Sequence, residues 1–282
     1  MALLVAFAGN GAFADSLKEG KGTFRFKNGD GPEIRVFYYK AKDLPDNSPI
    51  MFVMHGVNRD ADRYLAEWRR LAREYGFLLI CPEFSENAFP GARGYNLGNV
   101  FDTDGNMNPE ELWSYSYIEG IFDDVKKRTG YRNRGYYMYG HSAGSQFVHR
   151  MIFFQPQARF IKAVSANAGW YTLPLPDIDF PYGLNNTPVS RRDLMRALNQ
   201  PLVVLLGTKD NDPNHRHLRR APEAMRQGDH RFERGHTFYF MGEKQARHLS
   251  VNFGWEIKHV PGVAHHNRYM AAAAVEELFG NK

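Results

Sequence analysis

Short runs of apolar residues recur along the chain and alternate with segments of helical periodicity. The inner runs are continuously apolar, which is typical of strands that are covered on both faces. They predict β-strands at Ile34–Tyr39, Ile50–Met54, Phe77–Cys81, Tyr136–Tyr139, Phe160–Val164, Leu202–Leu206 and Trp255–Val260. The pattern therefore predicts a sheet buried between two layers.

Between these runs, apolar residues return at the spacing of one helix face. The clearest cases lie within residues 64–72, 115–125 and 147–152. Strands that alternate with helices need crossover connections, and such connections favour a parallel sheet. The chain is therefore expected to have an α/β fold, with a mostly parallel central sheet, helices on both faces and at most a small cap.

The segment 22–40 follows another pattern. The turn sequence Asn28-Gly29-Asp30-Gly31 separates two extended stretches and predicts an antiparallel hairpin at the start of the sheet. Two predicted loops, 82–110 and 167–200, are longer than a compact fold needs. Long ordered loops after strands often carry the functional site of an α/β protein.

One of the strand–helix junctions carries a chemical motif. Gly140-His141-Ser142-Ala143-Gly144 matches the pattern G-x-S-x-G directly after a predicted strand and directly before a predicted helix. In that setting a serine sits on a sharp turn with its hydroxyl exposed. The alternative is an ordinary glycine-rich loop whose serine caps the helix. The context favours Ser142 as a nucleophile.

A serine nucleophile needs a base, and the base needs an acid to orient it. With this motif the chain order is serine, acid, histidine. Asp210 and Asp212 follow the strand Leu202–Leu206. We expect Asp210 to be the acid because it lies nearer the end of the strand, and Asp212 is the alternative.

Two histidines follow the strand Trp255–Val260. His265 lies in the connecting loop, whereas His266 is expected to begin the last helix. We therefore expect His265 to be the base, with His266 as the alternative.

The charge that develops during acyl transfer needs two backbone N–H donors, which form an oxyanion hole. Ala143, directly after the nucleophile, is expected to supply one of them. The second is expected from Val57, in the loop His55-Gly56-Val57-Asn58-Arg59 after the strand Ile50–Met54. A simple turn at this His-Gly pair is the alternative.

Together these motifs resemble the α/β-hydrolase superfamily over essentially all of residues 20–282. Within it, the segments 55–61, 140–144 and 260–265 resemble the polyhydroxybutyrate-depolymerase-like esterases, whose relatives include feruloyl and acetylxylan esterases. The resemblance implies a triad of Ser142, Asp210 and His265 and oxyanion donors at Val57 and Ala143. It says little about the substrate, because that superfamily performs many reactions on one scaffold.

Composition narrows the picture further. The 282 residues include one cysteine, Cys81, so an intrachain disulfide framework is excluded, and Cys81 is expected to be a core residue. No apolar stretch is long enough to span a membrane. The net charge of +5 suggests nucleic acid only weakly. The basic stretch 209–236 also contains acidic residues and is expected to be a solvated face.

Three further features have the composition of a binding site. Asp102-Thr103-Asp104-Gly105-Asn106 resembles the start of a calcium loop, but Trp113 stands where the final glutamate should be, so a polar turn is expected. His215-Arg216-His217 lacks further ligands for a metal. Trp170 and Tyr171 either line a substrate pocket or pack in the interior. No metal and no cofactor are expected.

The N-terminus resembles a targeting signal. Residues 1–14 are uncharged, include an apolar run and end in Ala12-Phe13-Ala14, a small-x-small sequence typical of signal-peptidase sites. A basic segment before the run is missing, so an apolar N-terminus of a cytoplasmic protein is the alternative. The prediction is a signal peptide over 1–14, a secreted or periplasmic location, and one domain over 15–282.

These observations predict a serine hydrolase that cleaves carboxylic esters through an acyl-enzyme, with no cofactor. The expected substrate is a small-molecule or oligomeric ester, and no nucleic acid partner is expected. A serine peptidase or amidase is the alternative, since the same triad cleaves amides. A non-catalytic binding protein on this scaffold is disfavoured because every catalytic position is filled.

Overall fold

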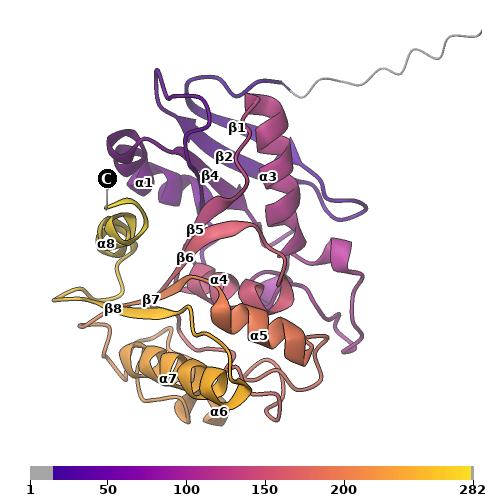
Figure 1. Cartoon of the computed structure of the whole chain (residues 1–282), viewed down its shortest axis with the longest axis vertical. Coiled ribbons are helices and arrows are strands. Elements are labelled where there is room, and N and C mark those ends of the chain that lie inside the picture. The colour runs from indigo at the N-terminus through magenta and orange to yellow at the C-terminus, as the bar shows by residue number, and fades with distance from the viewer. Residues whose placement is uncertain (1–14, 281–282) are drawn as a thin grey trace, which may run out of the picture.

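The structure of the chain, a computed structural model, describes residues 15–280 and is built around one sheet (Figure 1). The sheet has eight strands in the order β1-β2-β4-β3-β5-β6-β7-β8. Strand β2 pairs antiparallel with both β1 and β4, and every other pairing is parallel. The strands are β1 (Gly20–Phe26), β2 (Ile34–Lys40), β3 (Ile50–Met54), β4 (Leu78–Glu83), β5 (Tyr136–His141), β6 (Phe160–Ala166), β7 (Leu202–Gly207) and β8 (Glu256–Val260).

Each predicted strand has a counterpart in this sheet, with ends that differ by at most two residues. The predicted hairpin is confirmed, because Phe26 pairs with Ile34 across the turn. Cys81 is buried in β4 and belongs to the core, as predicted. Burial raises the pKa of its thiol.

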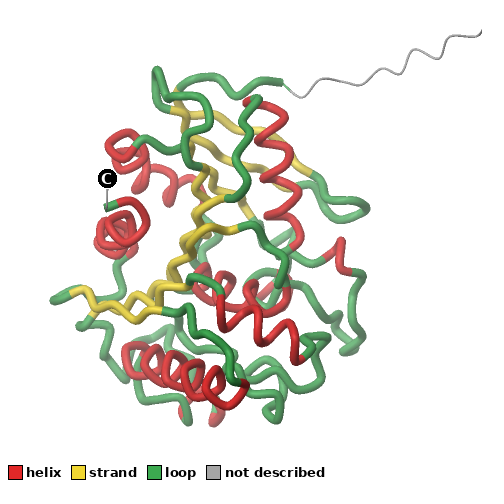
Figure 2. Tube along the Cα trace, in the orientation of Figure 1, coloured by secondary structure: helices red, strands yellow, loops and turns green. Residues whose placement is uncertain are grey.

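Helices cover both faces of the sheet (Figure 2). They are α1 (Ala61–Tyr75), α2 (Gly91–Gly94), α3 (Ser116–Thr129), α4 (Ala143–Phe154), α5 (Arg191–Asn199), α6 (Pro222–Met225), α7 (Arg231–Leu249) and α8 (Asn267–Phe279), with a short 3₁₀ helix at Glu110–Leu112. Helices α1 and α8 pack into one core cluster, and α3, α4, α5 and α7 into the cluster on the other face. The fold is that of the α/β hydrolases, as predicted.

The prediction that 209–236 is a solvated face is wrong for its second half. Helix α7 begins there, and Arg231 and Arg234 are only 2% and 0% exposed. The helix buries Phe238, Ala246 and Leu249 against the core, and this packing carries its first turn inward. The apolar spacing along 231–249 is sparse and interrupted by charge, so the sequence pattern does not predict this helix.

Two other expectations concern local structure. The side chain of Asp102 accepts hydrogen bonds from the backbone N–H groups of Asp104 and Asn106, both at 2.8 Å, so the segment is a polar turn. Those bonds, with Asn106 first, lower the pKa of Asp102. The signal-peptide prediction concerns residues 1–14, which lie outside the described residues.

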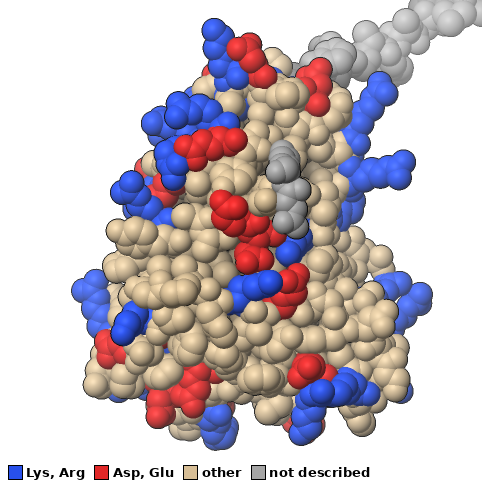
Figure 3. Space-filling model, turned by 60° about the vertical axis from the view of Figure 1, so that its left-hand side comes forward, with Lys and Arg blue, Asp and Glu red and all other residues tan. Residues whose placement is uncertain are grey.

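Two surface properties bear on possible partners. No helix among residues 15–280 combines the length and the apolar character that crossing a membrane requires. On the face shown in Figure 3, basic and acidic side chains lie beside one another around a large uncharged area. That face carries no continuous band of one charge.

Candidate active site

Ser142 lies between β5 and α4, on the turn that the motif predicts. Its backbone has φ 59° and ψ −115°, a left-handed conformation that is uncommon for a residue with a side chain. The backbone N–H of Ser142 donates to the carbonyl of Ala166 at 3.1 Å, which anchors the turn to β6. A strained conformation of this kind persists only where the surrounding structure holds it in place. Such conformations cluster at functional sites.

The two glycines of the motif are required by close backbone contacts. A Cβ on Gly140 would lie 2.1 Å from the carbonyl oxygen of Gly144. A Cβ on Gly144 would lie 2.2 Å from the carbonyl oxygen of Met54 at the end of β3. The first glycine allows the tight turn, and the second allows α4 to start against the neighbouring strand.

Asp210 and His265 form a hydrogen-bonded pair. His265 Nδ1 lies 2.6 Å from Oδ2 of Asp210, whose side chain is 3% exposed. The alternative acid, Asp212, is exposed and accepts a hydrogen bond from the backbone N–H of Asn214 at 2.8 Å. The alternative base, His266, is the exposed N-cap of α8. The geometry favours Asp210 and His265.

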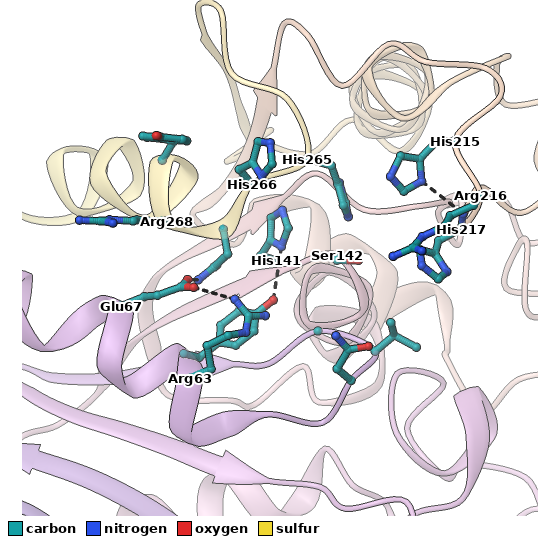
Figure 4. Close-up of a pocket in the computed structure, with 16 residues that line it drawn as sticks. Arg63, Glu67, His141, Ser142, His215, Arg216, His217, His265, His266 and Arg268 are labelled. Atoms are coloured by element: carbon teal, nitrogen blue, oxygen red, sulfur yellow. Dashed lines mark hydrogen bonds and ion pairs between the residues drawn. The ribbon is translucent and has the colours of Figure 1, made fainter.

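Ser142 and His265 line the same cavity, which has a volume of about 610 Å³ (Figure 4). Its walls come from the loop after β3, from α1, from the segment 215–217, and from the loop that leads into α8. Val57 also lines it, and 61% of that residue is exposed. The site therefore lies where the carboxyl ends of β3, β5, β7 and β8 meet, which is the expected edge for this kind of sheet.

The loop that carries Val57 is fixed by the buried His55. The ring lies with Nδ1 3.0 Å from the carbonyl of Gly56, and its Nε2 accepts from the backbone N–H of Phe84 at 3.1 Å. These contacts make His55 neutral with the proton on Nδ1, and burial lowers its pKa to about 4. Ala143 is the first residue of α4, so its N–H belongs to the unpaired donors at the start of a helix.

Two more histidines pack against the ring of His265, and the sequence pattern did not single out either for this position. The ring centroid of His141 lies 4.5 Å from that of His265, and the centroid of His215 lies 5.7 Å away. Burial, followed by the charge of His265, lowers the pKa of His141 well below its usual value. His141 could have been suspected only as the second residue of the motif.

Trp170 and Tyr171 are not among the residues that line the cavity. Trp170 is 5% exposed, and the guanidinium carbons of Arg150 and Arg219 lie 4.2 and 5.0 Å from the centroid of its ring. Tyr171 is fully buried and stacks on Phe238 with ring centroids 4.6 Å apart. Of the two alternatives for these residues, burial favours packing in the interior over the expected substrate-binding role, because the loop after β6 turns inward.

The cavity walls are rich in basic side chains. Arg63, Arg216 and Arg268 line it, against one acidic residue, Glu67. Arg63 is paired with Asp60 and Glu67, at 2.6 and 2.7 Å. Within the described part of the chain, the exposed Arg216 and Arg268 have neither a side-chain hydrogen bond nor an ion pair. Figure 4 shows them on opposite sides of Ser142 and His265.

Residues 15–280 contain no cluster of three or more histidine, cysteine, aspartate or glutamate side chains that could hold a metal ion. His215 instead faces Arg231, with Nδ1 3.1 Å from Nη2.

Comparisons with known proteins agree with this architecture. The poly(aspartic acid) hydrolase-1 of Sphingomonas sp. KT-1 has a similar structure with 43% identity and a TM-score of 0.91, over 94% of this chain and all of that one. LpqC, a poly(3-hydroxybutyrate) depolymerase from Bordetella parapertussis, has 31% identity and a TM-score of 0.89, over 94% of this chain and 92% of its own.

A weaker match is the bifunctional acetylxylan esterase/xylanase XynS20E of Neocallimastix patriciarum. It is 24% identical over 131 residues, which are 46% of this chain and 17% of that protein. The chain thus spans less than a fifth of that relative. No family model matches the chain.

These likenesses define the class: the chain belongs to the α/β-hydrolase esterase family, as its sequence motifs predicted. Within that family it stands with the depolymerase LpqC and the poly(aspartic acid) hydrolase, and it is a hydrolase.

Proposed function

We propose that the protein cleaves carboxylic esters with Ser142 as nucleophile, His265 as general base and Asp210 as the acid that orients His265. The observation that carries the proposal is the 2.6 Å contact between His265 and Asp210 in the cavity that Ser142 also lines. The carboxylate holds the imidazole with its proton on Nδ1, which leaves Nε2 free to accept the serine proton.

The reaction has two halves. Ser142 Oγ attacks the acyl carbon while His265 takes its proton, and the oxyanion that forms accepts hydrogen bonds from the N–H groups of Val57 and Ala143. Collapse of this intermediate breaks the ester bond, and His265 returns the proton to the leaving alcohol. Water then attacks the acyl-serine with His265 again as base, and the acid is released. No cofactor takes part.

A fluorophosphonate probe and a series of p-nitrophenyl acyl esters test the proposal. The probe is expected to form one adduct, which peptide mass spectrometry locates at Ser142. Ser142→Ala is expected to lose both labelling and ester cleavage while its melting temperature stays near that of the parent. An unlabelled parent protein, or an active Ser142→Ala variant, would contradict the mechanism.

A second candidate is cleavage of amide bonds in an acidic polymer. Two observations favour it: the similarity to a poly(aspartic acid) hydrolase, and the unpaired Arg216 and Arg268 on the cavity walls. The guanidinium group is well suited to bind carboxylates. Poly(aspartic acid), poly(3-hydroxybutyrate) and p-nitrophenyl esters, assayed side by side, separate the candidates. Release of new amino groups from poly(aspartic acid) supports the amidase, and cleavage of only the two kinds of ester supports the esterase.

The proposed location is outside the cytoplasm, with residues 1–14 removed as a signal peptide. The support is the uncharged apolar segment that ends in Ala12-Phe13-Ala14. Mass spectrometry of the native protein is expected to find Asp15 as the first residue. Native protein that retains Met1 would contradict this proposal.

A further inference from the structure

One guanidinium group contacts the acid of the catalytic pair from the side opposite to His265. Arg231 opens α7, and its Nη1 donates to Oδ1 of Asp210 at 3.3 Å. Oδ2 of the same carboxylate faces His265. The side chains of Arg231 and Asp210 are each 3% exposed. The backbone N–H of Phe232 also donates to the carbonyl of Asp210, at 3.1 Å. The first turn of α7 thus holds both the main chain and the carboxylate of Asp210.

The same guanidinium group reaches a second residue of the site. Its Nη2 lies 3.1 Å from Nδ1 of His215, and the backbone N–H of His217 donates to that nitrogen at 3.2 Å. Arginine has only donors, so Nδ1 of His215 must be the acceptor and carry no proton. His215 is therefore neutral. Burial and then the charge of Arg231 lower its pKa, which agrees with this hydrogen-bond pattern.

Neutral His215 meets the ring of His265 at an angle of 61°. When His265 takes the proton from Ser142 it becomes positive, and a second charged imidazole beside it would disfavour that state. On the other side of the carboxylate, Arg231 balances the buried charge and occupies the oxygen that His265 does not use. A single side chain therefore fixes the rotamer of Asp210 and the protonation of His215.

Resting on the proposed triad, we infer that Arg231 is a positioning residue for the hydrolytic reaction, acting through the carboxylate of Asp210. It touches neither substrate nor nucleophile. Arg231→Met is expected to lower kcat about 10- to 100-fold with a short uncharged ester, because small displacements of a catalytic group have effects of that size. KM is expected to stay within about threefold, since the cavity walls remain. Arg231→Lys keeps the charge but cannot reach both partners, and is expected to recover part of the loss.

A double-mutant cycle tests whether Arg231 acts through Asp210. In an Asp210→Asn background, Arg231→Met is expected to change kcat by no more than about twofold, because the group it positions has already been lost. A residue that merely stabilises the fold would instead cause the same loss in both backgrounds. Arg247→Met, on the exposed end of the same helix, is the matched control and is expected to match the parent.

The outcomes separate this inference from the proposed function. If Asp210→Asn remains fully active, the triad itself is wrong and the inference falls with it. If Asp210→Asn is impaired but Arg231→Met keeps the parental kcat, only the inference is overturned. The same holds if the double variant shows the product of the two single losses in kcat. Should Arg231→Met fail to fold, the same cycle with Arg231→Lys decides between coupled and multiplied losses.

Discussion

Asn167 ties together the two loops that carry Asp210 and His265. Its side-chain oxygen accepts a hydrogen bond from the backbone N–H of Gly207 at 2.8 Å, at the end of β7. Its amide nitrogen donates to the carbonyl of Ala264 at 3.3 Å, one residue before His265. Asn167 is 1% exposed and has φ 52°, a conformation that asparagine tolerates better than most residues.

Removing this link is expected to lower both the free energy of unfolding and kcat. Asn167→Ala leaves the buried N–H of Gly207 without that partner, and should lower the free energy of unfolding by about 1–3 kcal/mol. It should also lower kcat, because both loops lose a common anchor. Urea unfolding and ester hydrolysis measure the two effects. Asn252→Ala, at an exposed position, is the control. Equal behaviour of the two variants would show that the link is unimportant.

The close approach of Gly144 to Met54 predicts a sharp steric effect. Gly144→Ala would place a methyl group 2.2 Å from a backbone oxygen, and backbone cannot rotate away as a side chain can. We expect loss of detectable ester cleavage and a lower melting temperature. Gly169→Ala is the matched control, because its nearest new contact is the end of the Gln146 side chain at 3.3 Å. An active Gly144→Ala variant would contradict the packing described for the turn.

The choice between the two candidate acids can be tested directly. Asp210→Asn is expected to reduce kcat by about 10⁴-fold, because the amide can hold His265 in the wrong tautomer. Asp212→Asn is expected to match the parent, since among residues 15–280 its side chain accepts a hydrogen bond from the backbone N–H of Asn214 and makes none to His265. Steady-state kinetics on one ester measures both variants. The reverse order of effects would reassign the acid.

The basic walls predict a preference for substrates that carry carboxylates. Arg216→Gln and Arg268→Gln are each expected to raise KM for an acidic substrate severalfold, with little effect on a neutral ester of the same length. Added salt should weaken the preference of the parent, because exposed charges are screened. Arg192→Gln removes an exposed arginine elsewhere and serves as control. Equal effects on acidic and neutral substrates would refute the role of these charges.

Buried His55 predicts that stability falls in mild acid. Its folded-state pKa is about 4, against about 6.5 in an unfolded chain, so below pH 6.5 the unfolded state binds a proton that the folded state refuses. The free energy of unfolding should therefore decrease as the pH drops from 6.5 to 4, by about 3 kcal/mol from this residue alone. Urea unfolding at several pH values measures the slope. A stability that is constant over this range would contradict the neutral, hydrogen-bonded His55.

The sheet could be predicted because its strands are continuous apolar runs, such as Ile50–Met54, which is fully buried as predicted. The elbow could be predicted because its two glycines and Ser142 are a local pattern. The contacts of Arg231 could not be predicted, since its burial depends on how α7 packs against β7, which lies more than 20 residues earlier in the chain. An arginine in a charged segment is expected to be exposed, and only the fold shows that Arg231 is buried.

The helix α5 shows a missed local signal. Ser190 and Asp193 form a capping box at its start, a motif that is readable in the sequence within the loop 167–200. For Trp170 and Tyr171 the sequence holds no deciding local signal, because aromatic residues after a strand fit a pocket wall and a core equally well. Only the direction in which the chain turns after β6 decides between them.

The unpaired guanidinium groups of Arg216 and Arg268 on the cavity walls also affect what happens after the bond is broken. Cleavage of an ester at Ser142 would leave a newly formed carboxylate in the cavity whose walls carry Arg216 and Arg268. Their charge then opposes departure of the acid, so product inhibition should grow as the reaction proceeds. Anionic buffers such as acetate and phosphate should compete for the same place, and turnover numbers should depend on which buffer ions are present.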